Sequence, residues 1–584
     1  MQKIYYYDIF FRKGECNCLN GKLKHIDLLL IQSFLLIVPF LFGLFYEFTA
    51  YFAQIFLLII LLIILIKRKK IRIYLNISIA SLLLITLGYL FTCFYAVDKG
   101  MAFLGFLKFT IPFTFAIILM QYKEKHINKI INVIPISGII MIILSIIFKY
   151  IPFLPDAFFL PNGRIAGFFQ YSNTFALFLL IGIIVLVNST LKNVKKFVGT
   201  VVLLIGILAT GSRIVFLLTI LNFIIFIIKF KNFRKYLIGL IGISIIITTI
   251  YVIITNNFNT FGRFLTTSFN SSTFLGRLLY YKDAIPQILQ NPFGLGYMGY
   301  SYIQPTIQTG VYSTVFIHSE LLQIALDIGI IPMIVFIITI LISLINKNKF
   351  NICKQILLTI ALHILFDFDL QFICMFLILV TTLNLFKGKR YIINANTKIF
   401  IPIIVILQII YLYFGICTLM HYIGNDNIAS KMYSAYTEAN LNLMHDYSEN
   451  NIEKANEIAD KISKNNQNIA MVYKVKAIYN RENKKWKTMI KNKEKSIEIN
   501  KYEISNYEEY ILMLSEAINY YINNDNIEDA EHCINLVVEL PSKIEKIQNS
   551  TSDIAYKLKD LPNFELSQDI QNYVSKMKGV LEND

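Results

Sequence analysis

Long apolar stretches recur along the first 420 residues of this 584-residue chain, and they constrain its fold more than any other feature. A helix needs roughly 20 apolar residues to cross the hydrocarbon layer of a bilayer. By that measure the sequence predicts about 13 membrane spans: 27–45, 51–66, 73–95, 103–121, 130–148, 172–190, 197–210, 214–229, 236–255, 321–345, 355–368, 371–386 and 398–419. Because 56% of the residues are hydrophobic, a soluble core could not bury them all. We therefore expect an all-α, polytopic membrane protein.

The loops between these spans predict the orientation of the chain. Lysine and arginine favour cytoplasmic loops, and here they collect in every second loop: 67–70, 122–129, 191–196, 229–235, 346–354 and 387–390. The net charge of +17 is then explained by basic residues in the cytoplasmic loops and does not indicate nucleic-acid binding. We expect a multi-pass protein of the cytoplasmic membrane with a cytoplasmic amino-terminal segment, 1–26. The outward segments are 149–171, 256–320 and everything after about residue 420.

After the last span the composition changes abruptly to Asn, Lys, Glu, Ile and Tyr, with apolar residues at helical spacing. This change predicts a polytopic domain, 27–420, followed by an extracytoplasmic domain, 421–584. Three similar segments in the second domain align Asn451, Asn483 and Asn526, which are 32 and 43 residues apart. Tetratricopeptide hairpins repeat about every 34 residues. We expect a small α-solenoid of this type, and an irregular helical bundle is the alternative.

The outward loop 256–320 is far longer than an ordinary connection, which favours a functional segment. Its central charges are Arg263, Arg277 and Lys282 against Asp283. Basic residues are normally depleted on the outer face, so this excess indicates an anionic partner, and the planar fork of arginine suits phosphate. Contact with lipid headgroups is the alternative. The loop also contains NPFGLGYMG, residues 291–299, whose glycines allow a tight turn with exposed backbone amides.

Other ionisable residues stand at the outer ends of predicted spans. Arg164 lies in PNGRIAGFFQ and Arg213 in LATGSRIVFLL. A charge this close to hydrocarbon costs about 3 kcal/mol unless it is paired or hydrated, so Arg213 is a functional candidate. The alternative is that the Arg213 side chain only extends to the membrane interface. His363 and Asp367 are four residues apart, which places them on one helix face. A buried pair that only joins two spans is the more ordinary interpretation.

The outer mouth of the tenth span, VYSTVFIHSELLQ, places His318 two residues before Glu320. A neutral imidazole accepts a proton from an attacking hydroxyl, and a nearby carboxylate orients the ring or raises its basicity. Interface packing is the alternative for His318, and capping of the helix is the alternative for Glu320. The outward-facing arginines around this segment favour a catalytic role for His318 over interface packing.

The seven cysteines are scattered along the chain. The only close pair, Cys16 and Cys18, has no further Cys or His run that would complete a metal site. We therefore expect neither a zinc site nor a disulfide framework.

The stretch HSELLQIALDIGIIP resembles the H-N-x-x-L-x-x-x-x-E-x-G element of the O-antigen ligase and polymerase family. His318, Leu322, Asp327 and Gly329 are in register with it, while Ser319 replaces the usual Asn and Asp327 the usual Glu. The segments GRLLYYKDAIPQILQNPFGLGYMGY, GSRIVFLL and GRIAGFFQYSNTFA are similar to the arginine elements of that family. HILFDFDLQF followed by an outward repeat domain is similar to members from bacteria without an outer membrane.

The resemblance implies a membrane glycosyltransferase that takes its glycan from undecaprenyl diphosphate, with no nucleotide sugar, no metal and no other cofactor. His318 would deprotonate the acceptor hydroxyl, with Glu320 beside it. Fixed arginines would stabilise the charge that develops on the leaving diphosphate; the candidates are Arg213, Arg277 and Arg164. Candidate supporting residues are Lys282, His363 and Asp367.

The expected partners are a lipid-linked glycan donor, a glycan or lipid-linked acceptor, membrane lipids, and a polysaccharide or protein at the carboxyl-terminal domain; no nucleic acid is expected. Polymerisation is preferred over ligation, because the Asn/Lys/Ile-rich chain with an outward repeat domain looks Gram-positive. A transporter or flippase of lipid-linked glycans would predict repeated groups of spans and polar residues near the bilayer midplane. A non-catalytic anchor for a repeat scaffold would leave Arg213 unexplained.

Overall fold

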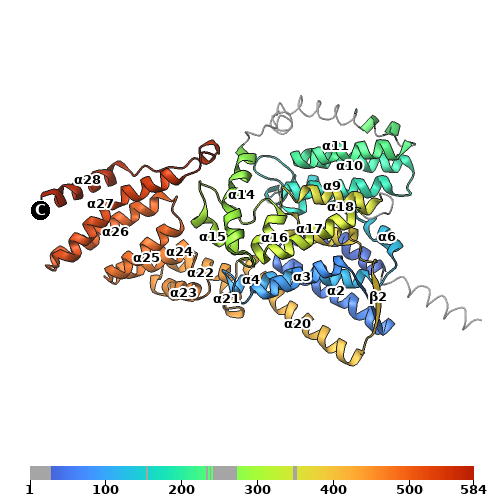
Figure 1. The fold of residues 1–584 in the computed structure, drawn as a ribbon, viewed down its shortest axis with the longest axis horizontal. Coiled ribbons are helices and arrows are strands. Elements are labelled where there is room, and N and C mark those ends of the chain that lie inside the picture. The colour runs from blue at the N-terminus through green and yellow to red at the C-terminus, as the bar shows by residue number, and fades with distance from the viewer. Residues whose placement is uncertain are drawn as a thin grey trace, which may run out of the picture. The chain divides into compact units, whose positions relative to one another are not determined.

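The computed structural model describes residues 28–152, 155–231, 234–236, 238–240, 242, 272–345 and 351–583. Within these ranges nearly every element is a helix, and the one sheet found there has two strands (Figure 1). The predicted all-α class is therefore confirmed. The predicted segment 1–26 and most of the predicted span 236–255 lie outside the described residues.

The chain divides into two compact units. Unit 1 comprises Met1–Thr86, Leu107–Thr267 and Ile334–Ile416, and unit 2 comprises Leu87–Phe106, Ser268–Met333 and Cys417–Asp584. The carboxyl-terminal residues therefore group with most of the predicted outward loop. The expected domain boundary near residue 420 stays a prediction.

Unit 1 is a bundle of apolar helices. Helix α9 (Ser172–Asn188) is buried along almost its whole length, and α7, α10, α11 and α18 pack around it. A helix that is apolar on every side is expected in such a central position. The other elements are α2 (Glu47–Arg68), α5 (Ile111–Leu119), α6 (Ile127–Ile131), α7 (Ile134–Phe148), α8 (Pro155–Phe158), α10 (Asn193–Thr210), α11 (Arg213–Lys229), α18 (Ile352–His363) and α19 (Ile373–Thr382). Four helices have residues in both units: α3 (Ile77–Thr92), α4 (Lys99–Phe109), α17 (Ile330–Ile345) and α20 (Thr397–Tyr422).

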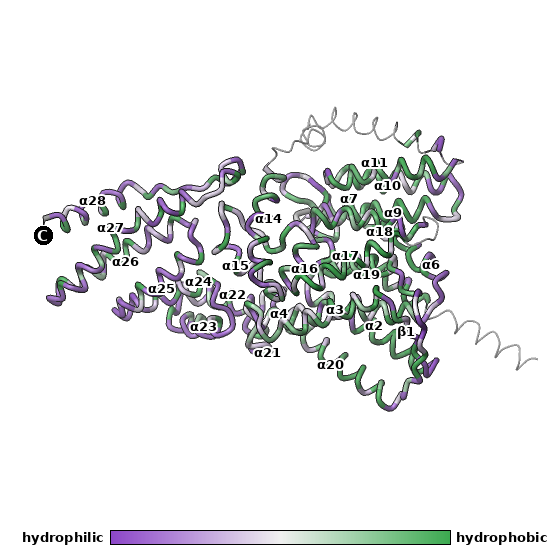
Figure 2. The backbone as a smooth tube through the Cα atoms, viewed as in Figure 1, coloured by the Kyte–Doolittle hydropathy of each residue, from purple (hydrophilic) through white to green (hydrophobic). Residues whose placement is uncertain are grey.

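Several helices have the length and composition of membrane spans. Five helical stretches in the described ranges are long and apolar enough to cross a bilayer: Glu47–Arg68, Lys99–Leu119 (α4 and α5), Glu124–Phe148 (which includes α6 and α7), Asn193–Thr210 and Thr397–Tyr422. Shorter apolar helices coincide with further predicted spans, and Figure 2 shows the hydrophobic colour along them. The apolar side chains of α20 are largely exposed, which suits contact with lipid rather than with water. The predicted polytopic membrane class is confirmed.

One small sheet joins two basic segments of unit 1. Strand β1 (Lys70–Leu75) pairs antiparallel with β2 (Lys389–Asn394), so that Lys70 lies opposite Asn394. Next to the sheet, the Asn76 side-chain amide donates to the carbonyl oxygens of Leu385 and Lys387 at 2.9 and 2.7 Å. Because the partners are far apart in sequence, the loop pattern alone does not predict this pairing.

The tenth predicted span, 321–345, is two helices rather than one. Helix α16 (Glu320–Ile328) ends at Gly329, and α17 begins directly after it. Gly329 has φ +99°, and a Cβ there would lie 2.5 Å from the Pro292 carbonyl oxygen. Only glycine combines this backbone conformation with so close an approach. Because the residues on both sides of Gly329 are apolar, the sequence predicted one continuous span.

Unit 2 combines three helices around the glycine-rich turn of the predicted loop with a carboxyl-terminal series of helical hairpins. The first three are α14 (Ser272–Gln290), α15 (Gly299–Ile307) and α16. The later ones are α21 (Asp426–Met432), α22 (Thr437–Ser448), α23 (Ile452–Asn465), α24 (Ala470–Glu482), α25 (Trp486–Ile499), α26 (Ile504–Asn523), α27 (Ile527–Ser550) and α28 (Gln568–Asn583). Sequential neighbours from α21 to α28 pack together.

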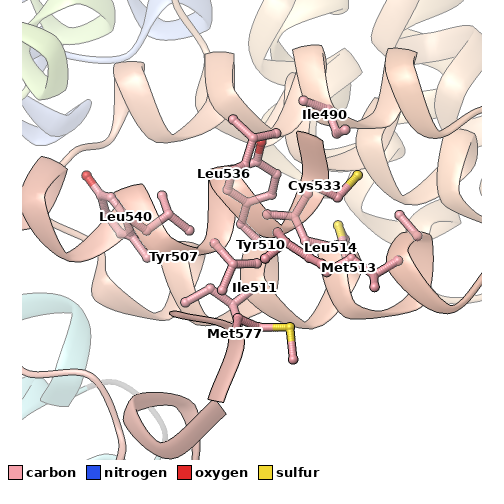
Figure 3. Packing of buried hydrophobic residues seen from close by; sticks show 14 of the residues in the cluster. Ile490, Tyr507, Tyr510, Ile511, Met513, Leu514, Cys533, Leu536, Leu540 and Met577 are labelled. Atoms are coloured by element: carbon pink, nitrogen blue, oxygen red, sulfur yellow. The ribbon is translucent and has the colours of Figure 1, made fainter. Parts of the chain in front are cut away.

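The carboxyl-terminal helices share a core of their own. Figure 3 shows Tyr510 and Leu514 of α26 packed among side chains of α25, α27 and α28. The aligned residues Asn451 and Asn526 begin helices α23 and α27, because each side-chain oxygen accepts a hydrogen bond from a backbone amide in the first turn. Successive hairpins agree with a helical repeat, while the tetratricopeptide identity stays a prediction.

Candidate functional site

Helix α14 carries the first part of the candidate site in unit 2. Arg277, Tyr280 and Tyr281 are three and four positions apart, so they share one face of the helix. The Tyr280 ring faces the His318 imidazole with the ring centres 6.2 Å apart. The Tyr281 hydroxyl donates a hydrogen bond to the His318 carbonyl oxygen. Burial raises the pKa of the Tyr280 phenol, and the nearby Arg277 guanidinium partly offsets the rise. Arg277 and His318 thus both lie close to Tyr280.

Asp283, further along α14, fixes the chain that leads to His318. Its carboxylate accepts hydrogen bonds from the Thr309 amide at 2.9 Å, the Thr309 hydroxyl at 2.7 Å and the Tyr312 hydroxyl at 2.8 Å. The Tyr312 ring also packs against Tyr280, with ring centres 4.5 Å apart. Since Asp283 is buried, these donors replace the water that its charge would otherwise require. The segment before His318 is therefore anchored at two points.

Helix α16 anchors the same segment from the other end. The Gln323 side-chain oxygen Oε1 accepts a hydrogen bond from the Ile317 backbone amide at 2.9 Å, and its side-chain nitrogen Nε2 donates to Asp327 Oδ1 at 2.8 Å. Asp327 Oδ2 accepts a hydrogen bond from the Tyr89 hydroxyl at 2.8 Å. All three side chains are buried. This relay runs from α3 to the residue directly before His318, which is itself only half-buried.

The glycine-rich turn wraps the end of α16. The amides of Leu295 and Gly296 donate to the carbonyl oxygens of Leu326 and Asp327 at 2.6 and 2.9 Å. At Gly294 φ is +92°, and a Cβ would lie 2.4 Å from the Asp327 carbonyl oxygen. The expectation of exposed amides is therefore wrong for Leu295 and Gly296, because they satisfy carbonyl groups that a helix end leaves unpaired.

Glu320 and Lys282 differ in their surroundings. Glu320 is the first residue of α16 and is 1% exposed, in the position where a carboxylate is favoured by the helix dipole. Lys282 is exposed, and its amine donates to the Ser552 hydroxyl at 3.1 Å. This hydrogen bond therefore connects Lys282 to the carboxyl-terminal segment.

Arg164 takes part in a polar network of unit 1. Its guanidinium donates to the Thr210 carbonyl oxygen at 2.5 Å and to Asn173 Oδ1 at 2.9 Å. Thr210 ends α10, where a cation is favoured by the helix dipole. The Asn173 amide and the Tyr171 hydroxyl each donate to Asp367, both at 2.8 Å. The predicted residues Arg164 and Asp367 are thus joined through Asn173.

Arg213 is the first residue of α11 and is half-buried. The helix before it ends at Gly211, whose φ of +61° turns the chain. A cation at a helix amino terminus opposes the helix dipole, so this position does not stabilise α11 through its charge.

The expected pairing of His363 with Asp367 is wrong. Helix α18 ends at His363, so the two residues do not share a helix face. His363 Nδ1 instead lies 2.5 Å from Asp369 Oδ2, and the Thr174 hydroxyl donates to Asp369 Oδ1 at 2.7 Å. Both members of the His363 and Asp369 pair are fully buried in unit 1.

The structure divides the predicted residues between the two units. Unit 1 holds Arg164, Arg213, His363 and Asp367, and unit 2 holds Arg277, Lys282, His318 and Glu320. Five further residues take part in these contacts without having been predicted from the sequence: Tyr89, Asn173, Asp283, Gln323 and Asp369. The spacing of four between Gln323 and Asp327 was the one local indication available. The other contacts join residues that are distant in sequence.

Comparison with known proteins supports the family predicted from the motifs. Residues 198–337 match the family model described as O-antigen ligase. No curated protein sequence matches the chain. The matched region contains five of the predicted site residues: Arg213, Arg277, Lys282, His318 and Glu320. Residues 198–337 are thus a domain of the O-antigen ligase family, as the resemblance of the sequence predicted.

Proposed function

We propose that this membrane protein is a metal-independent glycosyltransferase that uses glycans carried on undecaprenyl diphosphate at the outer face of the cytoplasmic membrane. Its family is one of membrane enzymes that process glycans. The preferred reaction is polymerisation of a surface polysaccharide rather than ligation. The observation that carries the proposal is the half-buried His318 imidazole within the matched region, whose backbone is held by α14 and α16 and whose ring faces Tyr280, a neighbour of Arg277.

In the proposed reaction, His318 removes the proton from an acceptor hydroxyl, whose oxygen forms a bond to the anomeric carbon of the donor. The bond from that carbon to the diphosphate oxygen breaks, and undecaprenyl diphosphate leaves with the electron pair. Arginine side chains stabilise the growing negative charge because they are fixed before the reaction begins. Arg277 and Arg213 are the proposed diphosphate ligands, and Arg164 is a third. Glu320 is proposed to support His318.

The orientation within the membrane is part of the proposal. Pairing of β1 with β2 supports a common side for the basic loops 67–70 and 387–390. In unit 2, Asp98 accepts hydrogen bonds from Thr437 at 2.5 Å and from Asn465 at 2.7 Å. These contacts support placing the turn between α3 and α4 on the same side as the carboxyl-terminal residues.

The proposal is tested with purified full-length protein and a synthetic undecaprenyl diphosphate-linked repeat unit. We expect His318→Ala to abolish transfer, whereas His445→Ala, which removes an exposed histidine of α22, should leave it unchanged. Normal product length from His318→Ala would refute the assignment of the base. Single repeat units left on lipid in a deletion strain indicate a polymerase, whereas long lipid-linked chains indicate a ligase. Unprocessed units confined to the inner leaflet would favour a flippase.

A second substitution tests diphosphate binding. Arg277→Lys keeps the charge but loses the planar fork, so we expect a large rise in KM for the donor. Arg390→Lys, in an exposed strand position, is the matched control. Equal behaviour of the two variants would refute the role of Arg277.

A further inference from the structure

The connection between α27 and α28 contacts both the start of α14 and the chain that follows α15. The Ser552 amide donates a hydrogen bond to the Thr309 carbonyl oxygen at 2.8 Å, and the Lys559 amide donates one to the Ser272 hydroxyl at 3.0 Å. Ser272 is the first residue of α14, which lies beside this connection in Figure 1. Residues 551–559 of the carboxyl-terminal domain are therefore fixed to two elements of the candidate site.

Ala555 lies at the centre of this contact. It is the first residue of a short 3-10 helix, η7 (Ala555–Lys557), is fully buried, and shares one core cluster with Leu279 and Tyr312. A Cβ added at Gly310 would lie 2.6 Å from the Ala555 Cβ, so the two chains are closely packed there. Cores of this density do not accommodate added atoms unless the surrounding groups move. A larger side chain in place of Ala555 would therefore displace the chain around Gly310, or α14.

The chain around Gly310 leads directly to the candidate base. The Tyr312 hydroxyl donates to Asp283 of α14 at 2.8 Å, and the Tyr312 ring packs against Tyr280. The Tyr280 ring in turn faces the His318 imidazole. Packing contacts thus extend from η7 through two tyrosines to His318.

The 551–559 segment is also fixed to the other carboxyl-terminal helices. Thr551 directly follows α27, and its hydroxyl lies 2.9 Å from the hydroxyl of Tyr502, which is buried between α25 and α26. Helices α26 and α28 both pack against α27. A displacement of α26 or α27 would therefore move the 551–559 segment with it.

We propose that the 551–559 segment holds residues 309–318 in place, so that the carboxyl-terminal helices set the position of the His318 imidazole. Ala555 is a positioning residue in this scheme, because it acts through Tyr312 and not by contact with the substrate. The inference rests on the proposed function, in which His318 is the base. It gives the carboxyl-terminal helices a part in the transfer step itself, in addition to any contact with a polysaccharide or a protein.

Enlargement of Ala555 tests this positioning. We expect Ala555→Leu to lower kcat on the order of tenfold, with KM for the donor within about twofold, because a small displacement of a catalytic group slows the chemical step more than it weakens binding. Hydrogen–deuterium exchange of the full-length protein in detergent should be faster at the backbone amides of residues 309–318. Ala555→Val should change both measurements in the same direction but by less, and it serves as the test if the leucine variant does not fold.

The control Ala530→Leu enlarges a buried alanine of α27 that packs among the other carboxyl-terminal helices. It should lower the thermal unfolding midpoint but leave kcat and the exchange of residues 309–318 as in the wild type. Unchanged exchange of these amides in the Ala555 variants, faster exchange with a normal kcat, or an equal loss of kcat in Ala530→Leu would overturn the proposal. Wild-type protein that transfers no glycan would refute the proposed function instead, and the exchange rates would still decide whether the 551–559 segment holds residues 309–318.

Discussion

Gln323 donates a hydrogen bond to Asp327 at 2.8 Å while it accepts one from the amide next to His318. The two residues are one helical turn apart in α16, so the helix fixes the geometry of the relay. The Tyr89 hydroxyl donates a hydrogen bond to the other carboxylate oxygen of Asp327, Oδ2. The position of the candidate base is therefore set by buried groups on two other elements.

The relay predicts a positioning role for Gln323. We expect Gln323→Leu to lower kcat at least tenfold with KM for the donor within about twofold, because a buried polar group left without its partner costs about 1–3 kcal/mol. Steady-state transfer assays measure this split. Gln287→Leu on α14 is a matched control and should retain normal kcat. A normal kcat for Gln323→Leu would contradict the role.

The hydrogen bond from Tyr281 to the His318 carbonyl predicts a difference between two neighbouring tyrosines. Tyr281→Phe removes this bond, and the loss of about 1 kcal/mol should lower kcat roughly fivefold. Tyr280→Phe keeps the ring that faces His318 and should be close to normal. The same transfer assay compares them, and equal rates would show that the Tyr281 bond does not position His318.

Alanine substitutions at Gly329 and Gly424 distinguish the cost of backbone strain from the cost of a steric clash. Both have positive φ, but a Cβ meets the Pro292 carbonyl only at Gly329, whereas nothing lies within 4 Å at Gly424. We expect Gly424→Ala to destabilise the protein by about 1–2 kcal/mol and Gly329→Ala by about 2–5 kcal/mol. Thermal unfolding midpoints in detergent measure the difference. Equal midpoints would indicate that the 292–294 turn moves freely.

The carboxyl-terminal helices contain an ionic cluster that predicts acid sensitivity. Lys474 and Lys493 each lie 2.6 Å from a different oxygen of Glu509. Burial opposes ionisation of Glu509, but the hydrogen bonds from both lysines outweigh it and hold its pKa below the ordinary value of 4.5. The stabilisation of the folded protein by ionised Glu509 is present above pH 4.5, and it is lost as the pH falls through the lowered pKa of Glu509 in the folded state.

Replacement of this carboxylate tests the sign of the effect. Glu509→Gln should destabilise the protein by about 1–3 kcal/mol at neutral pH, because Lys493 is fully buried. The difference from the wild type should shrink below pH 4.5. Glu516→Gln, whose partner Arg481 lies 3.8 Å away in an exposed pair, should change stability by less than about 1 kcal/mol. Chemical unfolding at several pH values measures both variants.

The sequence predicted the features that depend on local composition. Apolar length located the helices of unit 1, and the motif around His318 located a segment that the structure holds in place. Asn451 and Asn526 marked helix starts because a cap acts through its own neighbours.

Features that depend on distant contacts were not predictable in this way. The break at Gly329 arises from the Pro292 carbonyl, and the run 321–345 carries no trace of that contact. The partner of His363 was misassigned because the spacing rule holds only while a helix continues, and α18 ends there. Tyr89 and Asp327 meet through the fold alone.

The pairing of β1 with β2 also sets an order for biogenesis. Asn76 and its acceptor Leu385 are 309 residues apart, so a ribosome adding about 5–20 residues per second needs roughly 15–60 s to supply the partner. During that time the first strand presents an unpaired edge, which is a site for incorrect association. Completion of the bundle therefore depends on one of the last segments of unit 1 to leave the ribosome.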